Sequence, residues 1–195
     1  MQKSIGIVLY NFYPEKNRII LLDREKGKIS CIMQGKNICL GSVISYVCEK
    51  RQRGTFLCDV EVIEVPCELA QQDILFLHHT LEICFYFIPF DGGKSQVFDL
   101  ILFLYAHISV ASERARKKLF LCKLFTMLGI CPEYKTAEKI YFYLAELSSV
   151  DMITHEAIDL KNERTLERWL LQSLLEHPRM QKFKTIHFLT KNRAP

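Results

Sequence analysis

Short runs of alternating hydrophobic and polar residues fill the first 65 residues, which is the pattern of half-buried β-strands. The clearest run is Thr55–Val65, where the apolar positions from Phe56 to Val62 share one face and Asp59 and Glu61 lie on the other. Further strands are predicted at residues 4–10, 18–23, 29–34 and 42–48. So many short strands predict a small closed β-barrel, because closure removes exposed sheet edges. The pattern alone fits OB and SH3-like barrels equally.

The period of the apolar residues changes after Pro66, and from Leu69 onward it is helical. Leu121, Leu124 and Leu128 form one stripe, and Gly129 stands where a helix commonly ends. Helices are predicted at residues 71–87, 96–109, 112–128 and 136–147, and from an N-cap at Asn162 to the residues before Pro178. The predicted fold class is α+β, with a barrel domain over residues 1–67 and a helical domain over residues 68–195.

Two apolar stretches, 74–90 and 97–110, raise the question of membrane insertion. Each carries ionisable side chains, and the second is shorter than the roughly 20 residues that span a bilayer. Buried helices are therefore predicted, with no membrane partner. The eight cysteines form no C-x-x-C pair, and the N-terminal residues lack the features of a signal peptide. Free thiols in a reducing cytoplasm are expected, with no metal and no cofactor.

The net charge of +4 is small, but the basic residues of the barrel are clustered in loops and turns. Aromatic residues, among them Tyr10, Phe12, Tyr46 and Phe56, lie on the same strands. Cations can bind phosphates and aromatic rings can stack on bases, so this combination indicates a single-strand binding platform. Alternatively, the charges form a solvated rim and the rings belong to the core. The candidate DNA-binding residues are Arg24, Lys26, Lys28, Lys36, Lys50, Arg51 and Arg53.

A second basic cluster begins the helix predicted at residues 112–128 and includes Arg114, Arg116, Lys117, Lys118 and Lys123. Cations near a helix N-terminus oppose the helix dipole, which hints at an acidic partner. The stretch after Glu176 is also basic and holds no acidic residue.

Enzymatic motifs are not found. Gly93-Lys94-Ser95 resembles the end of a P-loop, but the upstream glycine is missing and the segment follows a predicted helix instead of a strand. The histidines at 78, 79 and 107 have no carboxylate at metal-ligand spacing. The sequence therefore favours a binding protein over an enzyme.

Four segments carry a family resemblance through their order along nearly the whole chain. They are Gly6–Leu9 with Lys26–Ser30, then Val97–Ile101, then Lys118–Pro132, and finally Leu175–His177 with Phe183–Leu189. In this order they resemble the RecO family of bacterial recombination mediators. The resemblance departs from the family in two places: the zinc-binding cysteines of some members are missing, and the basic loop keeps only Lys36, with Gln34 where lysine is common.

The resemblance implies an OB fold for the barrel and a role in DNA repair and homologous recombination. Such a protein would bind and anneal single- and double-stranded DNA in the bacterial cytoplasm, associated with the nucleoid during repair. It would engage the acidic tail of single-strand binding protein and work with RecR to load RecA on coated single strands. Residues that match the family's third-helix segment, a plausible partner-binding site, are Arg116, Lys117, Lys118 and Leu121. The alternative is a protein-interaction adaptor whose barrel has lost DNA binding.

Overall fold

The computed structural model describes residues 3–12, 17–33, 37–93, 95–132, 137–148 and 160–178, together with residue 183. Lys36 and the basic residues predicted after Glu176 lie outside this part of the chain. The chain divides into two compact units, and helix α1 (Cys67–Phe87) contributes to both. Unit 1 comprises Met1–Cys67 with Thr80–Asp99, and unit 2 comprises Glu68–His79 with Leu100–Pro195.

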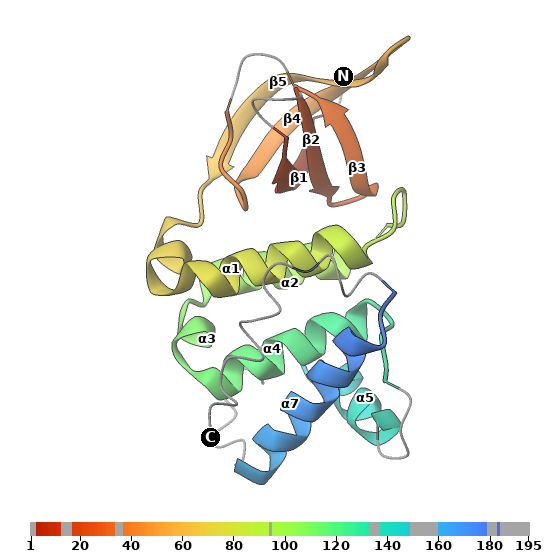
Figure 1. Ribbon diagram of the computed structural model, residues 1–195. Coiled ribbons are helices and arrows are strands. Elements are labelled where there is room, and N and C mark those ends of the chain that lie inside the picture. The colour runs from red at the N-terminus through yellow and green to blue at the C-terminus, as the bar shows by residue number, and fades with distance from the viewer. Residues whose placement is uncertain are drawn as a thin grey trace. The chain divides into compact units, whose positions relative to one another are not determined.

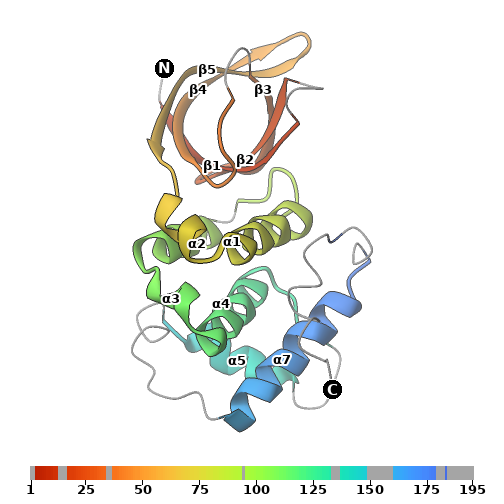
Figure 2. The same ribbon diagram turned by 60° about the vertical axis from the view of Figure 1, so that its left-hand side comes forward.

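Unit 1 is built on a closed β-barrel whose strand order is β1-β2-β3-β5-β4 (Figures 1 and 2). The strands are β1 (Ser4–Asn11), β2 (Arg18–Asp23), β3 (Gly27–Ile32), β4 (Val43–Arg51) and β5 (Gly54–Glu64). All neighbours are antiparallel except β3 and β5, which pair in parallel at Ile32 and Phe56. The closed five-stranded barrel confirms the predicted α+β fold class, and its strand order is OB-like.

Apolar side chains at alternating strand positions fill the barrel interior. Its buried core includes Val8, Ile19, Leu21, Cys31, Met33, Ile44, Tyr46 and Leu57. On β5 the predicted apolar face is only partly correct, because Leu57 and not Phe56 belongs to the core. Strand β2 differs from simple alternation, because the outward-pointing Ile20 and Leu22 are buried as well. An uninterrupted apolar run is typical of a strand covered on both faces. Within unit 1, the end of α1 lies against the outside of the barrel, where Phe85 stacks on Tyr10 at a centroid distance of 5.0 Å.

A buried carboxylate joins two strands of the barrel and the β2–β3 turn. Asp23, at the end of β2, accepts hydrogen bonds from the backbone N–H groups of Glu25 (2.9 Å) and Lys26 (2.7 Å), which fixes the β2–β3 turn. Its other oxygen accepts a hydrogen bond from the hydroxyl group of Tyr46, a fully buried residue of β4. Burial, and then the hydrogen bond to Asp23, raises the pKa of Tyr46 well above its ordinary value. Tyr46 therefore remains a donor at every physiological pH.

The β2–β3 turn requires glycine at position 27. Gly27 has a φ of +76°, and a Cβ atom there would lie 2.0 Å from the carbonyl oxygen of Gly92. The residues after α1 approach the turn closely, and the N–H of Asp91 donates to the carbonyl of Lys28 over 3.1 Å. A side chain at position 27 would force these two backbone segments apart.

Unit 2 is helical and is organised around α4 (Arg114–Met127), in which the nine consecutive residues 118–126 are buried. Its neighbours include α3 (Ser109–Ser112), α5 (Ala137–Glu146) and α7 (Leu160–Leu175). Phe120 meets Phe76 of α1 edge-on at a centroid distance of 5.8 Å. Phe125 meets Trp169 of α7 at 6.4 Å. A helix buried on all sides is apolar around its circumference except where its polar groups find partners.

The helix boundaries differ from the prediction in three places. Helix α1 begins at Cys67 and is interrupted at Asp73, whose carboxylate accepts the N–H of Phe76 over 2.9 Å and so caps the second segment. The helix predicted at 96–109 is α2 (Ser95–Ala106), and a separate short α3 follows it. The predicted N-cap at Asn162 is wrong because α7 begins at Leu160, and Asn is only mildly unfavourable inside a helix. None of the described helices combines the length and apolar character needed to cross a bilayer.

Replacing Tyr46 with Phe should destabilise the barrel by about 1–3 kcal/mol, because one buried oxygen of Asp23 loses its donor. The expected result is faster amide hydrogen exchange in β1–β5, measured by mass spectrometry. The control is Tyr10→Phe, which keeps the ring that stacks on Phe85. Equal exchange rates in the two variants would contradict this role for the Tyr46 hydroxyl.

Candidate nucleic-acid interface

Three side chains form a row across the outside of the barrel. Ile32 on β3 lies between two core residues, so it points outward, and it pairs with Arg18 of β2 on one side and Phe56 of β5 on the other. Phe56 points outward because its neighbour Leu57 belongs to the core. The row therefore offers a cation, an aliphatic side chain and an aromatic ring on three adjacent strands.

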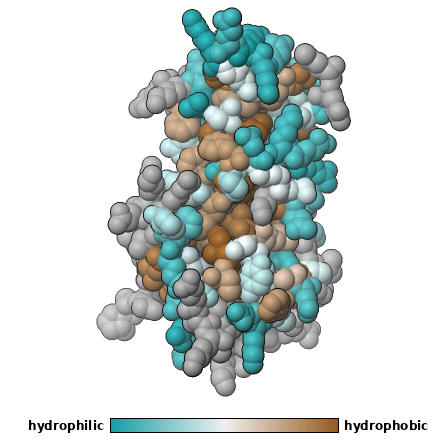
Figure 3. All heavy atoms as spheres, turned by 90° about the vertical axis from the view of Figure 1, so that its right-hand side faces the viewer, coloured by the Kyte–Doolittle hydropathy of each residue, from teal (hydrophilic) through white to brown (hydrophobic). Residues whose placement is uncertain are grey.

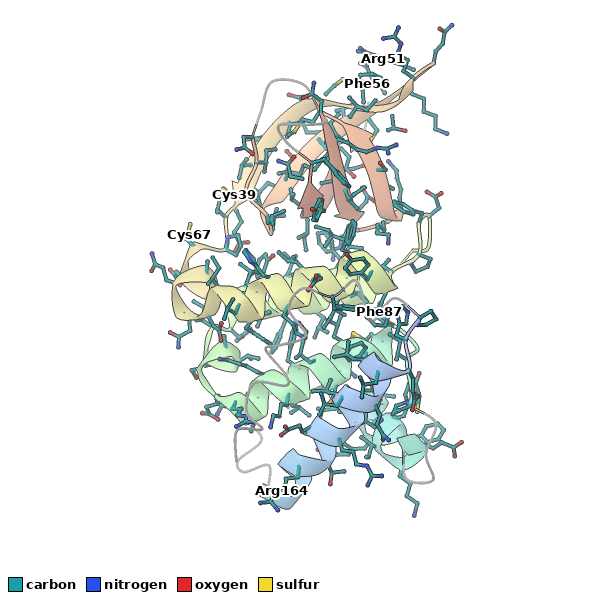
Figure 4. All side chains as sticks on the ribbon, viewed as in Figure 1. Cys39, Arg51, Phe56, Cys67, Phe87 and Arg164 are labelled. Carbon is teal, nitrogen blue, oxygen red and sulfur yellow. The ribbon has the colours of Figure 1, made fainter. Side chains whose placement is uncertain are left out.

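The β4–β5 hairpin continues this row beyond the barrel. Glu49 lies opposite Phe56, and Arg51 lies opposite Gly54. Gly54 has a φ of +131°, which favours glycine in this turn, and a Cβ atom there would lie 3.6 Å from Cδ1 of Ile32. Arg51 reaches diagonally across the hairpin toward Phe56. Its guanidinium carbon lies 4.9 Å from the centroid of the Phe56 ring, and Figure 4 shows the two residues side by side.

Charge at the hairpin is predominantly positive, and Figure 3 shows hydrophilic side chains gathered at this end of unit 1. Lys50, Arg51 and Arg53 supply three cations, and Glu49 supplies one carboxylate. Glu49 Oε2 accepts hydrogen bonds from Nη2 (2.6 Å) and Nε (3.2 Å) of Arg51. The hydrogen bond from Arg51 lowers the pKa of Glu49, and the same contact raises the pKa of Arg51, so both groups stay charged.

We name this surface the hairpin face, formed by Arg18, Ile32, Glu49, Arg51 and Phe56, with Arg53 in the adjoining turn. In OB folds, the β2–β3 surface and the β4–β5 loop are the parts that bind oligonucleotides. A ring flanked by cations can stack on a base while the cations contact the phosphates on either side. The hairpin face thus has the chemical groups of a nucleic-acid interface.

Of the predicted DNA-binding residues, Lys50, Arg51 and Arg53 all lie at the β4–β5 hairpin, but Lys50 points to the opposite face of β4 from Arg51. Arg24 and Lys26 lie at the opposite end of β2 from Arg18, about 17 Å away at roughly 3.3 Å per residue. Arg24 forms an ion pair with Asp99 at 3.1 Å, and Lys26 donates to the hydroxyl of Ser4 at 3.3 Å. These two residues remain cations of unit 1, but they do not belong to the hairpin face.

The prediction that Lys28 contacts DNA is wrong, because only 2% of this residue is exposed. Its ammonium group donates to the carbonyl oxygen of Phe85 over 2.7 Å and lies 4.6 Å from the centroid of the Phe90 ring. The hydrogen bond and the cation–π contact of this side chain therefore hold the end of α1 and the following loop against β3. A phosphate could not reach it without opening unit 1.

The predicted partner-binding residues on α4 are also engaged within unit 2. Lys117 pairs with Asp73 at 2.6 Å, and Lys118, whose side chain is 7% exposed, pairs with Glu167 at 2.7 Å. Arg116 lies 3.1 Å from Glu113, and Leu121 is fully buried. The prediction of a docking site is wrong for Lys118 and Leu121, because Glu167 of α7 neutralises the buried Lys118 and Leu121 faces the core.

Lys123 shows the same internal use of a cation. Its ammonium group donates to the carbonyl oxygens of Leu144 (2.7 Å) and Ala145 (3.0 Å) at the C-terminal turn of α5. Burial lowers the pKa of Lys123, and the two carbonyls in the last turn of α5 stabilise its ammonium group by accepting hydrogen bonds from it. Lys117, Lys118 and Lys123 therefore serve the packing within unit 2, whereas Arg114 remains largely exposed.

Arg18 was not identified from the sequence, although Phe56 was named among the aromatic residues of the barrel. The alternation around Ile19 and Leu21 places Arg18 on the outside of β2, which was the available signal. The parallel pairing that brings Phe56 beside Ile32 could not be read from the pattern, because β3 and β5 are separated by a whole strand along the chain.

The described residues form neither a metal site nor a reactive thiol among the buried cysteines. No group of three or more His, Cys, Asp or Glu side chains there is placed to hold a metal ion. All eight cysteines are free thiols. Burial raises the pKa of the Cys31 and Cys84 thiols to about 12, which leaves both protonated and unreactive at neutral pH.

Replacing Lys118 with Ala should lower the stability of unit 2 by about 1–3 kcal/mol, because Glu167 loses its shortest ion-pair contact. Trp169 is the only tryptophan and is fully buried in unit 2, so its fluorescence reports the unfolding of this unit in urea. The control is Lys139→Ala on the exposed face of α5, where no loss is expected. Equal stabilities of the two variants would contradict the stabilising role of the Lys118–Glu167 pair.

Comparison with known protein families and curated proteins identifies no relative of this chain. No model of a known protein family matches the chain. No curated protein matches it either. The resemblance of the four ordered segments to the RecO family therefore remains an expectation, and the functional argument rests on the hairpin face.

Proposed function

We propose that this chain binds single-stranded nucleic acid through the hairpin face of its OB-like barrel. The observation that carries the proposal is the Phe56 ring on the outer surface of β5, with Arg51 beside it and Arg18 two strands away. Stacking of a base on such a ring contributes about 1–3 kcal/mol and does not depend strongly on the identity of the base. The surrounding cations supply phosphate contacts and hence salt dependence.

Single strands fit this surface better than duplexes. A base paired inside a helix cannot stack on a side chain unless it leaves the duplex, whereas unpaired bases can do so directly. The hairpin also carries Arg51 and Arg53 within a few residues of the ring, which suits a flexible backbone that can turn its phosphates toward them. The proposal therefore combines one stacking position with adjacent phosphate positions.

The RecO-type role extends this proposal and rests on the order of the four segments. In that role the chain would anneal strands and help to load RecA on DNA coated by single-strand binding protein. The expected contact with the acidic tail of that protein cannot use Lys118 or Leu121 as they lie in unit 2. Partners such as RecR would have to engage other surfaces of the chain.

A protein-interaction adaptor remains the second candidate, and one observation favours it. Val62, Ile63 and Val65, at the end of β5, expose apolar side chains about 20 Å or more along the strand from Phe56 at roughly 3.3 Å per residue. Exposed apolar patches often mark protein contacts. The two candidates differ in whether the hairpin face binds oligonucleotides, so one binding assay separates them.

The test is fluorescence anisotropy of a labelled oligothymidylate of about 20 nucleotides, longer than the roughly 16 that one OB fold covers. The full chain should bind it at low salt, and the affinity should fall with a logarithmic salt slope of roughly −2 to −3 for three or four phosphate contacts. Replacing Phe56 with Ala should weaken binding by about 1–3 kcal/mol, between fivefold and about 150-fold.

The matched control is Phe142→Ala, which removes an aromatic ring that is 64% exposed on α5. This variant should bind as the unmodified chain does. Absence of salt-sensitive binding even at low ionic strength would exclude the DNA-binding proposal and favour the adaptor. Equal loss in both variants would move the interface away from the hairpin face.

A further inference from the structure

The stacking position on the hairpin face is already occupied in the free protein. The Arg51 guanidinium lies over the Phe56 ring at 4.9 Å, a distance at which a planar cation stacks on an aromatic face. Arg51 is paired with Gly54, so Phe56, two residues further along β5, is its diagonal cross-strand neighbour. A base that is to stack on the exposed face of Phe56 must therefore displace the guanidinium.

Glu49 holds the guanidinium in this position. One carboxylate oxygen accepts two hydrogen bonds from Arg51, and Glu49 lies directly opposite Phe56 in the β4–β5 register. A flat cation thus lies where a base would stack, and an oxyanion lies where a phosphate would meet Arg51. The three side chains form an internal substitute for a bound nucleotide.

We propose that Glu49 regulates nucleic-acid binding at the hairpin face by holding Arg51 over Phe56 until a single strand displaces it. This inference rests on the proposed function. Binding exchanges partners: a phosphate oxygen replaces the Glu49 carboxylate as the acceptor for the Arg51 guanidinium, and a base replaces the guanidinium on the ring. The fork of N–H donors in arginine fits a phosphate as well as a carboxylate, so the exchange conserves hydrogen bonds.

The exchange also explains why a carboxylate is present among the cations of the hairpin. Glu49 weakens binding of any anion that cannot also offer a base to Phe56, because such an anion competes with Glu49 without gaining a stacking contact. Free phosphate and acidic peptides are anions of this kind. Glu49 would therefore favour single-stranded nucleic acid over other polyanions at this surface.

The test is the affinity of the full-length Glu49→Gln variant for the labelled oligothymidylate. Binding should tighten about two- to fivefold, the size of an exposed ion pair, because Gln holds the guanidinium less strongly. The matched control is Glu64→Gln, which changes the net charge equally but lies on β5 about 26 Å from Phe56 at roughly 3.3 Å per residue. The control should change the affinity much less.

A double-mutant cycle separates the holding of Arg51 from simple repulsion between Glu49 and phosphate. In an Arg51→Gln background the contact is gone, so Glu49→Gln should no longer tighten binding. A gain that persists in that background, or a gain equal to that of Glu64→Gln, would overturn the inference while leaving the proposed function intact. Failure of the unmodified chain to bind the oligonucleotide would overturn the proposed function itself.

Discussion

The buried carboxylate of Asp23 sets the register on which the outer surface of the barrel depends. It ties the β2–β3 turn to Tyr46 of β4, and from this end the β2–β3 ladder runs to the pair of Arg18 and Ile32. A slip of one residue in this ladder would turn Arg18 and Ile32 toward the interior and bring core residues to the surface. A polar group inside the barrel thus determines which side chains face solvent at its far end.

Cations are used in opposite ways in the two units. In unit 2, Lys118 and Lys123 of α4 meet a carboxylate of α7 and the carbonyls of α5, so their charge serves the packing of helices. In unit 1, Lys28 is internal, whereas the hairpin cations stay at the surface. A basic residue in the sequence is therefore informative about ligands only once its carboxylate and carbonyl neighbours are known.

Much of the fold followed from local patterns, because strand alternation and helical stripes are set by which face is buried. The five strands and the buried stripe of Leu166, Trp169 and Leu170 are examples. The site was only partly predictable. The clustering of Lys50, Arg51 and Arg53 is local in sequence, but the burial of Lys28 depends on α1, and the row from Arg18 to Phe56 depends on a pairing between distant strands.

The eight thiols differ in their access to solvent: two are exposed, three are half-buried and three are buried. Cys39 and Cys67 are exposed and both belong to unit 1, whereas Cys84 and Cys122 are fully buried and burial raises the pKa of each (Figure 4). Electrophilic reagents attack thiolates that they can reach. Brief alkylation of the native chain would thus place spectroscopic labels on Cys39 and Cys67 of unit 1 and leave the buried thiols of unit 2 unlabelled. The two labelled cysteines would then serve for distance measurements.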